Sequence, residues 1–313
     1  MPPSASQLSN TWDHGVTLAR PAEPHAGNSP LLYVTTAVLM LSTVTPVMKS
    51  LLRQSDIPAL DLVCLRVFLA FICLVAVTLA GPWQELLRVS KGDVVRLTLL
   101  GILGVGIAYG LAGWALVYTN VSHYSVIYSL HPTLTALLSL VLRKDRVSTL
   151  KLAGIALSLC GCLFALPDWL FDQDVGFGDL LVLLFTLSAA ACVVLSSGMV
   201  KRYGAAATTT VMFGTGLVFL LPGAMIWSLP SHVQVSLTNG LLIVYVGVAT
   251  AAVFLLRNLS LQFLTPATVG AFHNLVPVFG ILIAASFLGE PITANMVVGG
   301  TAVLAGVELV RRG

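Results

Sequence analysis

The segment LHPTLTALLSLVLRKDRVS, residues 130–148, returns 145 residues later as LVPVFGILIAASFLGEPIT, residues 275–293. Around these segments, residues 116–162 and 261–307 align without a gap. The alignment superposes identical or similar residues: Leu116 on Leu261, Leu130 on Leu275, Pro132 on Pro277, Asp145 on Glu290, Ser148 on Thr293, Gly154 on Gly299, Leu159 on Leu304 and Gly161 on Gly306. Similarity at one fixed interval indicates that the chain contains two copies of one unit.

The composition of the chain is that of an integral membrane protein. Hydrophobic residues make up 57% of the chain and charged residues only 9%, whereas soluble domains carry about 25% charged residues. Long stretches without charge suit a bilayer core about 30 Å thick. Residues 1–30 are polar and rich in Pro and Ser, so we expect a disordered tail there.

Ten hydrophobic segments have lengths that suit membrane-spanning helices. Their continuous apolar runs favour helices over barrel strands, in which apolar residues alternate. The sequence therefore predicts an all-α integral membrane protein with ten transmembrane helices, in a first five-helix repeat at 31–166 and a second at 179–311. The predicted spans are 31–52, 58–80, 94–118, 121–142, 149–166, 179–200, 207–229, 236–262, 267–289 and 294–310.

Lysine and arginine residues lie mainly on one side of these spans. If the N-terminus is cytoplasmic, twelve of the 16 are on the cytoplasmic side, two (Lys49 and Arg53) are on the other, and Arg66 and Arg257 lie within spans. Positive residues favour the cytoplasmic side. We therefore expect a multi-pass protein with both termini in the cytoplasm. Because each copy has five helices, the second copy is then inverted relative to the first.

The repeated motifs resemble those of a known family. Residues 275–280 (LVPVFG) and 287–293 (FLGEPIT), followed by Gly299 and Gly306, resemble the EamA-type repeat of the drug/metabolite transporter superfamily. The first copy is similar to the same repeat through residues 129–132 (SLHP) and through Asp145 in the acidic position. The first helix departs from the family, because residues 45–49 (TPVMK) stand in place of its tryptophan-glycine opening.

This resemblance implies a function. It implies a secondary transporter of the cell inner membrane, an exporter of small metabolites such as amino acids or related compounds. Inverted repeats place the binding site near the bilayer midplane, where the halves meet, and allow alternating access. The implied partners are a small-molecule substrate and the lipid bilayer, with no nucleic acid, and a homodimer is left open. We expect no cofactor and no metal site.

Histidines and aromatic residues within the spans are candidates for the binding cavity. Tyr124, Tyr128 and His131 follow i, i+4, i+7 spacing and share one helix face. In the second copy, His273 aligns with Tyr128, and Asn274 follows it. Buried imidazoles are costly in a membrane without partners, so they are expected to line a polar cavity. A hydrogen bond to a neighbouring helix and proton coupling are the alternatives.

Further candidates lie in other spans. Tyr109 and Trp114, in a glycine-rich span, are expected in the same cavity. Arg257 has no acidic residue nearby in sequence, so it is the candidate for binding an anionic substrate group such as a carboxylate. For Arg66 we expect a structural pairing with Asp61, its nearest carboxylate.

Several repeated residues are expected to be structural. Asp145 and Glu290 each lie three residues before a hydroxyl residue that starts a helix, which favours a role at the positive helix end over proton coupling. Pro132 and Pro277 are expected to kink their helices, with direct substrate contact left open. The remaining repeated residues are glycines seven apart, expected in a packing seam or a dimer contact: Gly154, Gly161, Gly299 and Gly306.

An intramembrane enzyme is the alternative from another class. Residues 176–179 (GFGD) match the GxGD string of intramembrane aspartyl proteases. That chemistry needs a second, facing aspartate, and no aspartate lies deep within a predicted span. HExxH, P-loop and GxSxG motifs are missing from the sequence as well. The match is therefore attributed to chance, and no enzymatic activity is expected.

Overall fold

A computed structural model describes residues 29–55, 57–81, 83–84, 89–119, 124, 127–143, 148–165, 176–226, 236–288 and 294–313. Residues 1–28 of the predicted tail and the acidic pair Asp145 and Glu290 lie outside these described residues.

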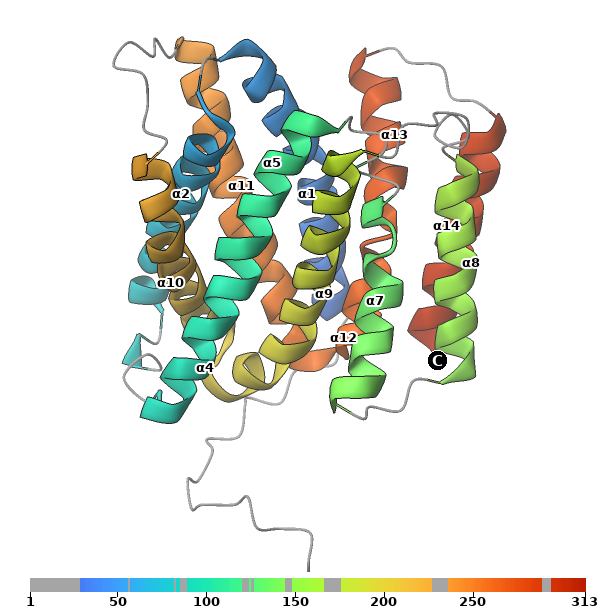
Figure 1. Ribbon diagram of the computed structural model, residues 1–313. Helices are drawn as coiled ribbons and strands as arrows, with labels where there is room; N and C mark the ends of the chain where they lie inside the picture. Colours follow the sequence, from blue (N-terminus) through green and yellow to red (C-terminus); the bar gives the residue numbers. More distant parts are fainter. Residues whose placement is uncertain are drawn as a thin grey trace, which may run out of the picture.

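The described chain consists of helices and short connections (Figure 1). The elements of the first copy are α1 (Ser29–Gln54), α2 (Ala59–Ala80), α4 (Lys91–Gly101), the π-helical η1 (Ile102–Ile107), α5 (Ala108–Tyr118), α7 (His131–Leu138), the π-helical η2 (Ser139–Arg143) and α8 (Thr149–Ala165). Those of the second copy are α9 (Phe177–Tyr203), α10 (Ala205–Ile226), α11 (Leu237–Phe263), α12 (Pro266–Phe272), α13 (Leu275–Leu288) and α14 (Ala294–Arg312).

The membrane-spanning character of the helices agrees with the sequence. Seven spans among the described residues are long and apolar enough to cross a bilayer: Ser29–Gln54, Ala59–Ala80, Lys91–Tyr118, Phe177–Tyr203, Ala205–Gly223, Leu237–Phe263 and Ala294–Arg312. Shorter apolar helices at His131–Leu142 and Thr149–Phe164 supply the fourth and fifth segments, and α12 with α13 supplies the ninth. The predicted all-α fold with ten transmembrane segments is confirmed.

The helices pack in a pattern that is symmetric between the two copies. The contact of α5 with α9 has its counterpart in that of α11 with α1, and α7 on α9 has its counterpart in α13 on α1. Equivalent segments also meet directly: α2 contacts α10, α8 contacts α14, and the fourth segment contacts the ninth through α7 and α12. A pseudo-two-fold relation between inverted halves produces this pattern.

The fourth and ninth segments are broken at equivalent positions. In the second copy, the turn His273–Asn274 separates α12 from α13, and in the first copy the turn Ser129–Leu130 precedes α7. Pro132 and Pro277 fall in the first turn of the helix that follows each break, where a missing N–H removes no helical hydrogen bond. The prolines thus start half-helices and do not kink continuous ones.

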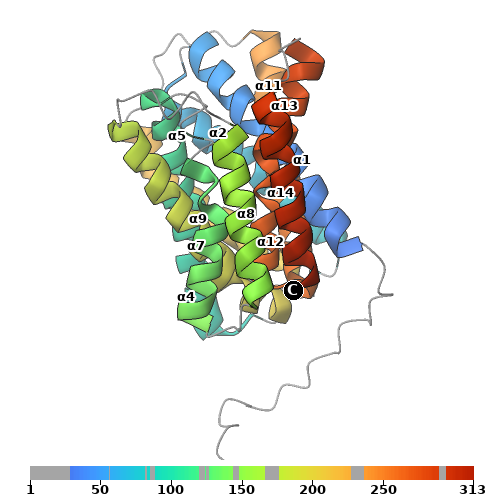
Figure 2. The same cartoon turned by 90° about the vertical axis from the view of Figure 1, so that its right-hand side faces the viewer.

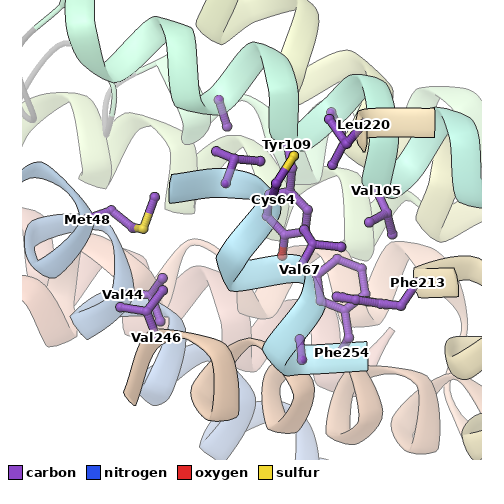
Figure 3. Packing of buried hydrophobic residues seen from close by; sticks show 14 of the residues in the cluster. Val44, Met48, Cys64, Val67, Val105, Tyr109, Phe213, Leu220, Val246 and Phe254 are labelled. Atoms are coloured by element: carbon purple, nitrogen blue, oxygen red, sulfur yellow. The ribbon is translucent and has the colours of Figure 1, made fainter. Parts of the chain in front are cut away.

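A cluster of buried apolar residues joins both halves of the molecule. Figure 3 shows Tyr109 at its centre, with Phe213 and Phe254 approaching from α10 and α11. The rings of Phe213 and Phe254 meet edge to face, 4.9 Å apart. Lipid is as apolar as this interior, so close packing holds these helices together. The other residues labelled there are Val44, Met48, Cys64, Val67, Val105, Leu220 and Val246.

The repeated glycines lie between α8 and α14, which are side by side in both views (Figures 1 and 2). A Cβ atom on Gly154 would lie 2.5 Å from the carbonyl oxygen of Gly306, and one on Gly161 would lie 2.6 Å from that of Gly299. Glycine is needed because the backbones approach too closely for a side chain. This seam is filled by two helices of one chain.

Candidate functional site

Two imidazoles and several aromatic rings gather at the helix breaks. The rings of His131 and His273, one from each copy, lie 4.5 Å apart. Tyr128 lies 5.4 Å from the His131 ring and 6.3 Å from that of His273. Phe185 of α9 stacks on Tyr128 at 5.6 Å and on Tyr124 at 5.7 Å. The structure therefore brings together Tyr124, Tyr128, His131 and His273, and adds Phe185.

The two histidines differ in their hydrogen bonds. His273 Nδ1 lies 3.1 Å from the carbonyl oxygen of Val269, one turn earlier in its own segment. His131 is 1% exposed, and its Nδ1 has no hydrogen-bond partner among the described residues. A buried polar atom without a partner is costly. His131 thus offers a polar atom that a bound molecule can satisfy.

Arg257 of α11 is a buried cation without a counter-charge. It is 5% exposed, and its guanidinium carbon lies 4.0 Å from the centre of the Phe254 ring. Its Nη2 donates a long hydrogen bond, 3.5 Å, to Asn258 Oδ1, and its Nε has no hydrogen-bond partner among the described residues. Among the described residues no carboxylate forms an ion pair with it. The guanidinium also lies close enough to the rings of His131 and His273 to interact with them electrostatically.

Arg66 does not pair with Asp61, so that prediction is wrong. Arg66 Nε donates to Thr250 Oγ1 of α11 at 2.7 Å, and Nη2 donates to the Tyr109 hydroxyl at 3.3 Å. Asp61 lies five residues earlier on the same helix, which places the two side chains about 140° apart around the axis. The guanidinium of Arg66 therefore turns inward, towards residues that are distant in sequence.

Tyr109 connects the two arginines. The Arg66 guanidinium carbon lies 4.3 Å from the centre of the Tyr109 ring, and the Tyr109 and Phe254 rings are 5.7 Å apart. Arg66, Tyr109, Phe254 and Arg257 thus form a row that runs from α2 through α5 to α11. Aromatic faces stabilise a guanidinium without neutralising it, so both positive charges remain inside the bundle.

Trp114 and Asn274 lie apart from this arrangement. Trp114 is 44% exposed and lines an apolar groove of about 380 Å³ between α2, α5 and α10. Asn274 is fully buried, and its Nδ2 donates to Ser158 Oγ of α8 at 2.6 Å, which ties the ninth segment to α8. Among these candidates, Tyr109, Tyr124, Tyr128, His131, Arg257 and His273 remain as cavity candidates.

Sequence reasoning missed Phe185, Thr250 and Phe254. Phe254 precedes Arg257 by three residues and so shares its helix face, a signal that the sequence does contain. Phe185 and Thr250 carry no such signal, because their partners lie in other segments of the chain.

Asp179, the acidic residue of the protease-like string, has a structural environment. Its Oδ2 accepts a hydrogen bond from the backbone N–H of Gly176 at 3.2 Å, and its Oδ1 accepts one from the Thr119 hydroxyl at 2.6 Å. It therefore caps the start of α9 and links that helix to the end of α5. Within the described ranges, no group of three or more His, Cys, Asp or Glu residues is placed to hold a metal ion.

Comparison with known families agrees with this architecture. The model of the EamA-like transporter family matches residues 28–166 and 176–312, one match for each copy. The chain belongs to the EamA-like transporter family.

Individual relatives carry transporter names. An uncharacterized transporter of Clostridium kluyveri is 25% identical over 68% of this chain and 70% of its own length. The uncharacterized transporter YyaM of Bacillus subtilis is 28% identical over 69% and 73%, and the protein RarD of Salmonella typhi is 27% identical over 75% and 79%. These relatives point to a membrane transporter and not to an enzyme.

A solved crystal structure shares the fold. It aligns with a TM-score of 0.74 and 20% identity, and it covers 90% of this chain and 97% of its own.

Proposed function

We propose that this protein is a secondary transporter that exports small metabolites carrying an anionic group, such as amino acids or related compounds. Transport would proceed by alternating access between the two inverted halves. The observation that carries the proposal is Arg257, a buried cation whose Nε has no hydrogen-bond partner in the part of the chain that the structure describes. Export is the direction that the family resemblance implies.

The chemistry of the site favours an anion. A guanidinium binds a carboxylate through two parallel hydrogen bonds, and such charge-assisted bonds are strong in a water-poor interior. A positive charge inside a membrane protein needs a counter-charge or an aqueous cavity. A substrate carboxylate would supply the counter-charge for Arg257, while the rings of Phe254 and Tyr128 would contact apolar parts of the same molecule.

The proposed site is asymmetric. Arg257 aligns with Ala112 of the first copy, and His131 aligns with Val276 of the second. The helix packing is therefore symmetric between the two copies, whereas the polar groups of the site come unevenly from them. Such unevenness supports one substrate site per chain.

We further propose that the protein resides in the cell inner membrane with both termini in the cytoplasm. The distribution of lysine and arginine supports this orientation. A reporter domain fused to the C-terminus tests it, and a signal from the outside would contradict it.

The function is tested in two stages. Cells that over-express the chain are screened for exported metabolites and for resistance to toxic analogues, and each hit is then tested for uptake into proteoliposomes. We expect Arg257→Gln and His273→Ala to reduce transport at least tenfold. Arg312→Gln is the matched control, because Arg312 lies at the exposed end of α14 and pairs with Glu308. Unchanged transport in both site variants would show that the site is elsewhere.

A separate cleavage assay tests the enzyme alternative. Cleavage of a membrane-embedded peptide by the purified protein, abolished by Asp179→Ala, would favour it. The capping role of Asp179 predicts lower stability of that variant and no such cleavage.

A further inference from the structure

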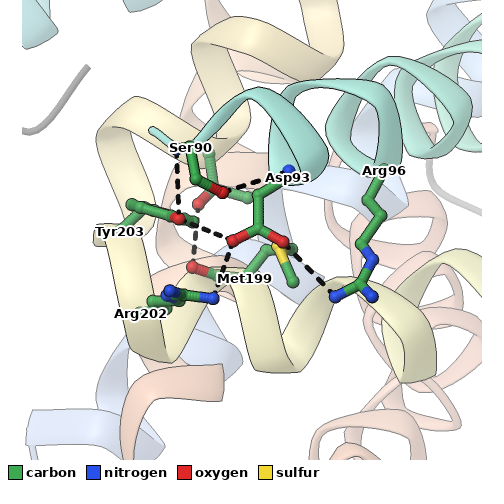
Figure 4. Close-up of polar contacts among 7 residues, drawn as sticks. Ser90, Asp93, Arg96, Met199, Arg202 and Tyr203 are labelled. Atoms are coloured by element: carbon green, nitrogen blue, oxygen red, sulfur yellow. Dashed lines mark hydrogen bonds and ion pairs between the residues drawn. The ribbon is translucent and has the colours of Figure 1, made fainter. Parts of the chain in front are cut away.

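A network of polar side chains surrounds Asp93 at one end of the bundle (Figure 4). Asp93 is 3% exposed, and its Oδ2 accepts hydrogen bonds from Arg202 Nη1 at 2.7 Å and from the Tyr203 hydroxyl at 2.6 Å. Arg96 Nη1 approaches Oδ1 at 3.3 Å from the exposed side. The backbone N–H of Ser90 also donates to the Tyr203 hydroxyl, at 3.4 Å.

This network joins the two halves of the molecule. Asp93 lies in the first turn of α4, in the first copy, whereas Arg202 and Tyr203 are the last residues but one and the last of α9, in the second. The C-terminus lies at the same end of the bundle in Figure 1.

The inverted repeat places an equivalent position at the opposite end. Ser90 precedes α4 and Ser236 precedes α11, so these two serines, and Asp93 and Asn239 three residues after them, occupy the same places relative to their helix starts, one residue off the 145-residue interval. The local geometry is the same, because each serine Oγ accepts from the backbone N–H three residues later, at 3.3 Å for Asp93 and 3.2 Å for Asn239. Both residues are buried. The difference is chemical, since a carboxylate at one end is replaced by an uncharged amide at the other.

We propose that Asp93, Arg202 and Tyr203 form an ionic latch that holds the α4–α9 end closed. The inference rests on the alternating access proposed above. In an inverted-repeat protein, the symmetry exchanges the α4–α9 contact at one end with the contact between the start of α11 and α1 at the other. Separation of α4 from α9 would break the charge-assisted hydrogen bonds that Arg202 and Tyr203 donate to Asp93, and these bonds stabilise the closed end.

The latch therefore biases the substrate-free protein towards one state. In that state the α4 end of the protein is closed and the binding site faces the opposite side of the membrane. Substrate that binds from the α4 end must supply enough interaction energy to separate Arg202 and Tyr203 from Asp93. With the orientation proposed above, the latch closes the cytoplasmic entrance.

Cys192 provides a native reporter for this state. It is buried on α9, and its Sγ lies against Gly104 of η1, where a Cβ atom would have no room. Separation of α9 from α4 and η1 would expose it. The other four cysteines, Cys64, Cys73, Cys160 and Cys162, are changed to alanine, and a charged, membrane-impermeant methanethiosulfonate is applied to vesicles whose α4 end faces the reagent.

We expect Asp93→Asn to raise the rate of Cys192 labelling about tenfold, the effect of losing a charge-assisted hydrogen bond. Arg202→Gln should raise the rate in the same direction, and the double variant should label no faster than Asp93→Asn alone, because that substitution already removes the charge that Arg202 pairs with. Arg96→Gln is the matched control. Its side chain is 69% exposed, so its removal should leave the rate unchanged.

Unchanged labelling in both Asp93→Asn and Arg202→Gln would overturn the latch, as would additive effects in the double variant. If Asp93→Asn does not yield monodisperse protein, Arg202→Gln decides alone, because that side chain is nearly half exposed and tolerates replacement. Labelling needs no substrate. A failure of the latch is therefore distinguishable from a failure of the proposed transport, which the proteoliposome experiment tests separately.

Discussion

Replacement of Gly306 by alanine should force α8 and α14 apart. The new Cβ atom would lie 2.5 Å from the carbonyl oxygen of Gly154 and 2.6 Å from the backbone nitrogen of Ser158. Ordinary contact begins at 3.4 Å, so α14 must retreat by about 0.9 Å from backbone atoms that cannot rotate away. Overpacking of this kind costs about 1–3 kcal/mol, while the loss of glycine from a helix returns about 0.5–1 kcal/mol.

Gly300→Ala is the matched control for this prediction. It makes the same substitution in the same helix, but a Cβ atom there meets nothing within 4 Å. The difference between the two variants thus isolates the packing cost, about 1–3 kcal/mol. Thermal unfolding in one detergent at one heating rate should give a Tm several degrees lower for Gly306→Ala than for Gly300→Ala. A Tm for Gly306→Ala equal to or above that of Gly300→Ala would refute the close approach of the two helices.

Two further predictions concern single positions. Gly204 has a φ of 78° between α9 and α10, so Gly204→Ala should cost about 1–2 kcal/mol; a Tm at or above that of the unmodified protein would contradict this. Thr250→Val removes the acceptor of the buried Arg66 Nε and should destabilise the protein by about 1–3 kcal/mol, while Thr250→Ser, which keeps the hydroxyl, should restore most of the Tm. An unchanged Tm for Thr250→Val together with a lower Tm for Thr250→Ser would show that packing of the methyl group, and not the hydrogen bond, is responsible.

The candidate site shows how far local sequence reasoning extends. The repeat alone placed His131 and His273 on equivalent helices, and the structure brings their rings to 4.5 Å. The expected pairing of Arg66 with Asp61 used nearness in sequence, which is a poor guide on a helix because only positions three or four apart share a face. The actual partner, Thr250, is 184 residues away.

The helix breaks, too, could be predicted only in part from the sequence. Pro132 and Pro277 signalled an interruption, but a proline within an apolar run fits both a kinked helix and two half-helices. The turns at Ser129–Leu130 and His273–Asn274 depend on what the neighbouring helices offer to the freed backbone groups. Tertiary packing therefore decides between these two outcomes.

The sequence by itself determined the all-helical class, the ten segments and the duplication, because a bilayer demands long uncharged runs and a duplication leaves a fixed interval. Only the tertiary structure decided which polar groups meet, including Arg66 with Thr250 and Asp93 with Arg202. The physical reason is that helix formation depends on neighbours within one turn, whereas the contacts that can bind a substrate or close a path join helices far apart in the chain.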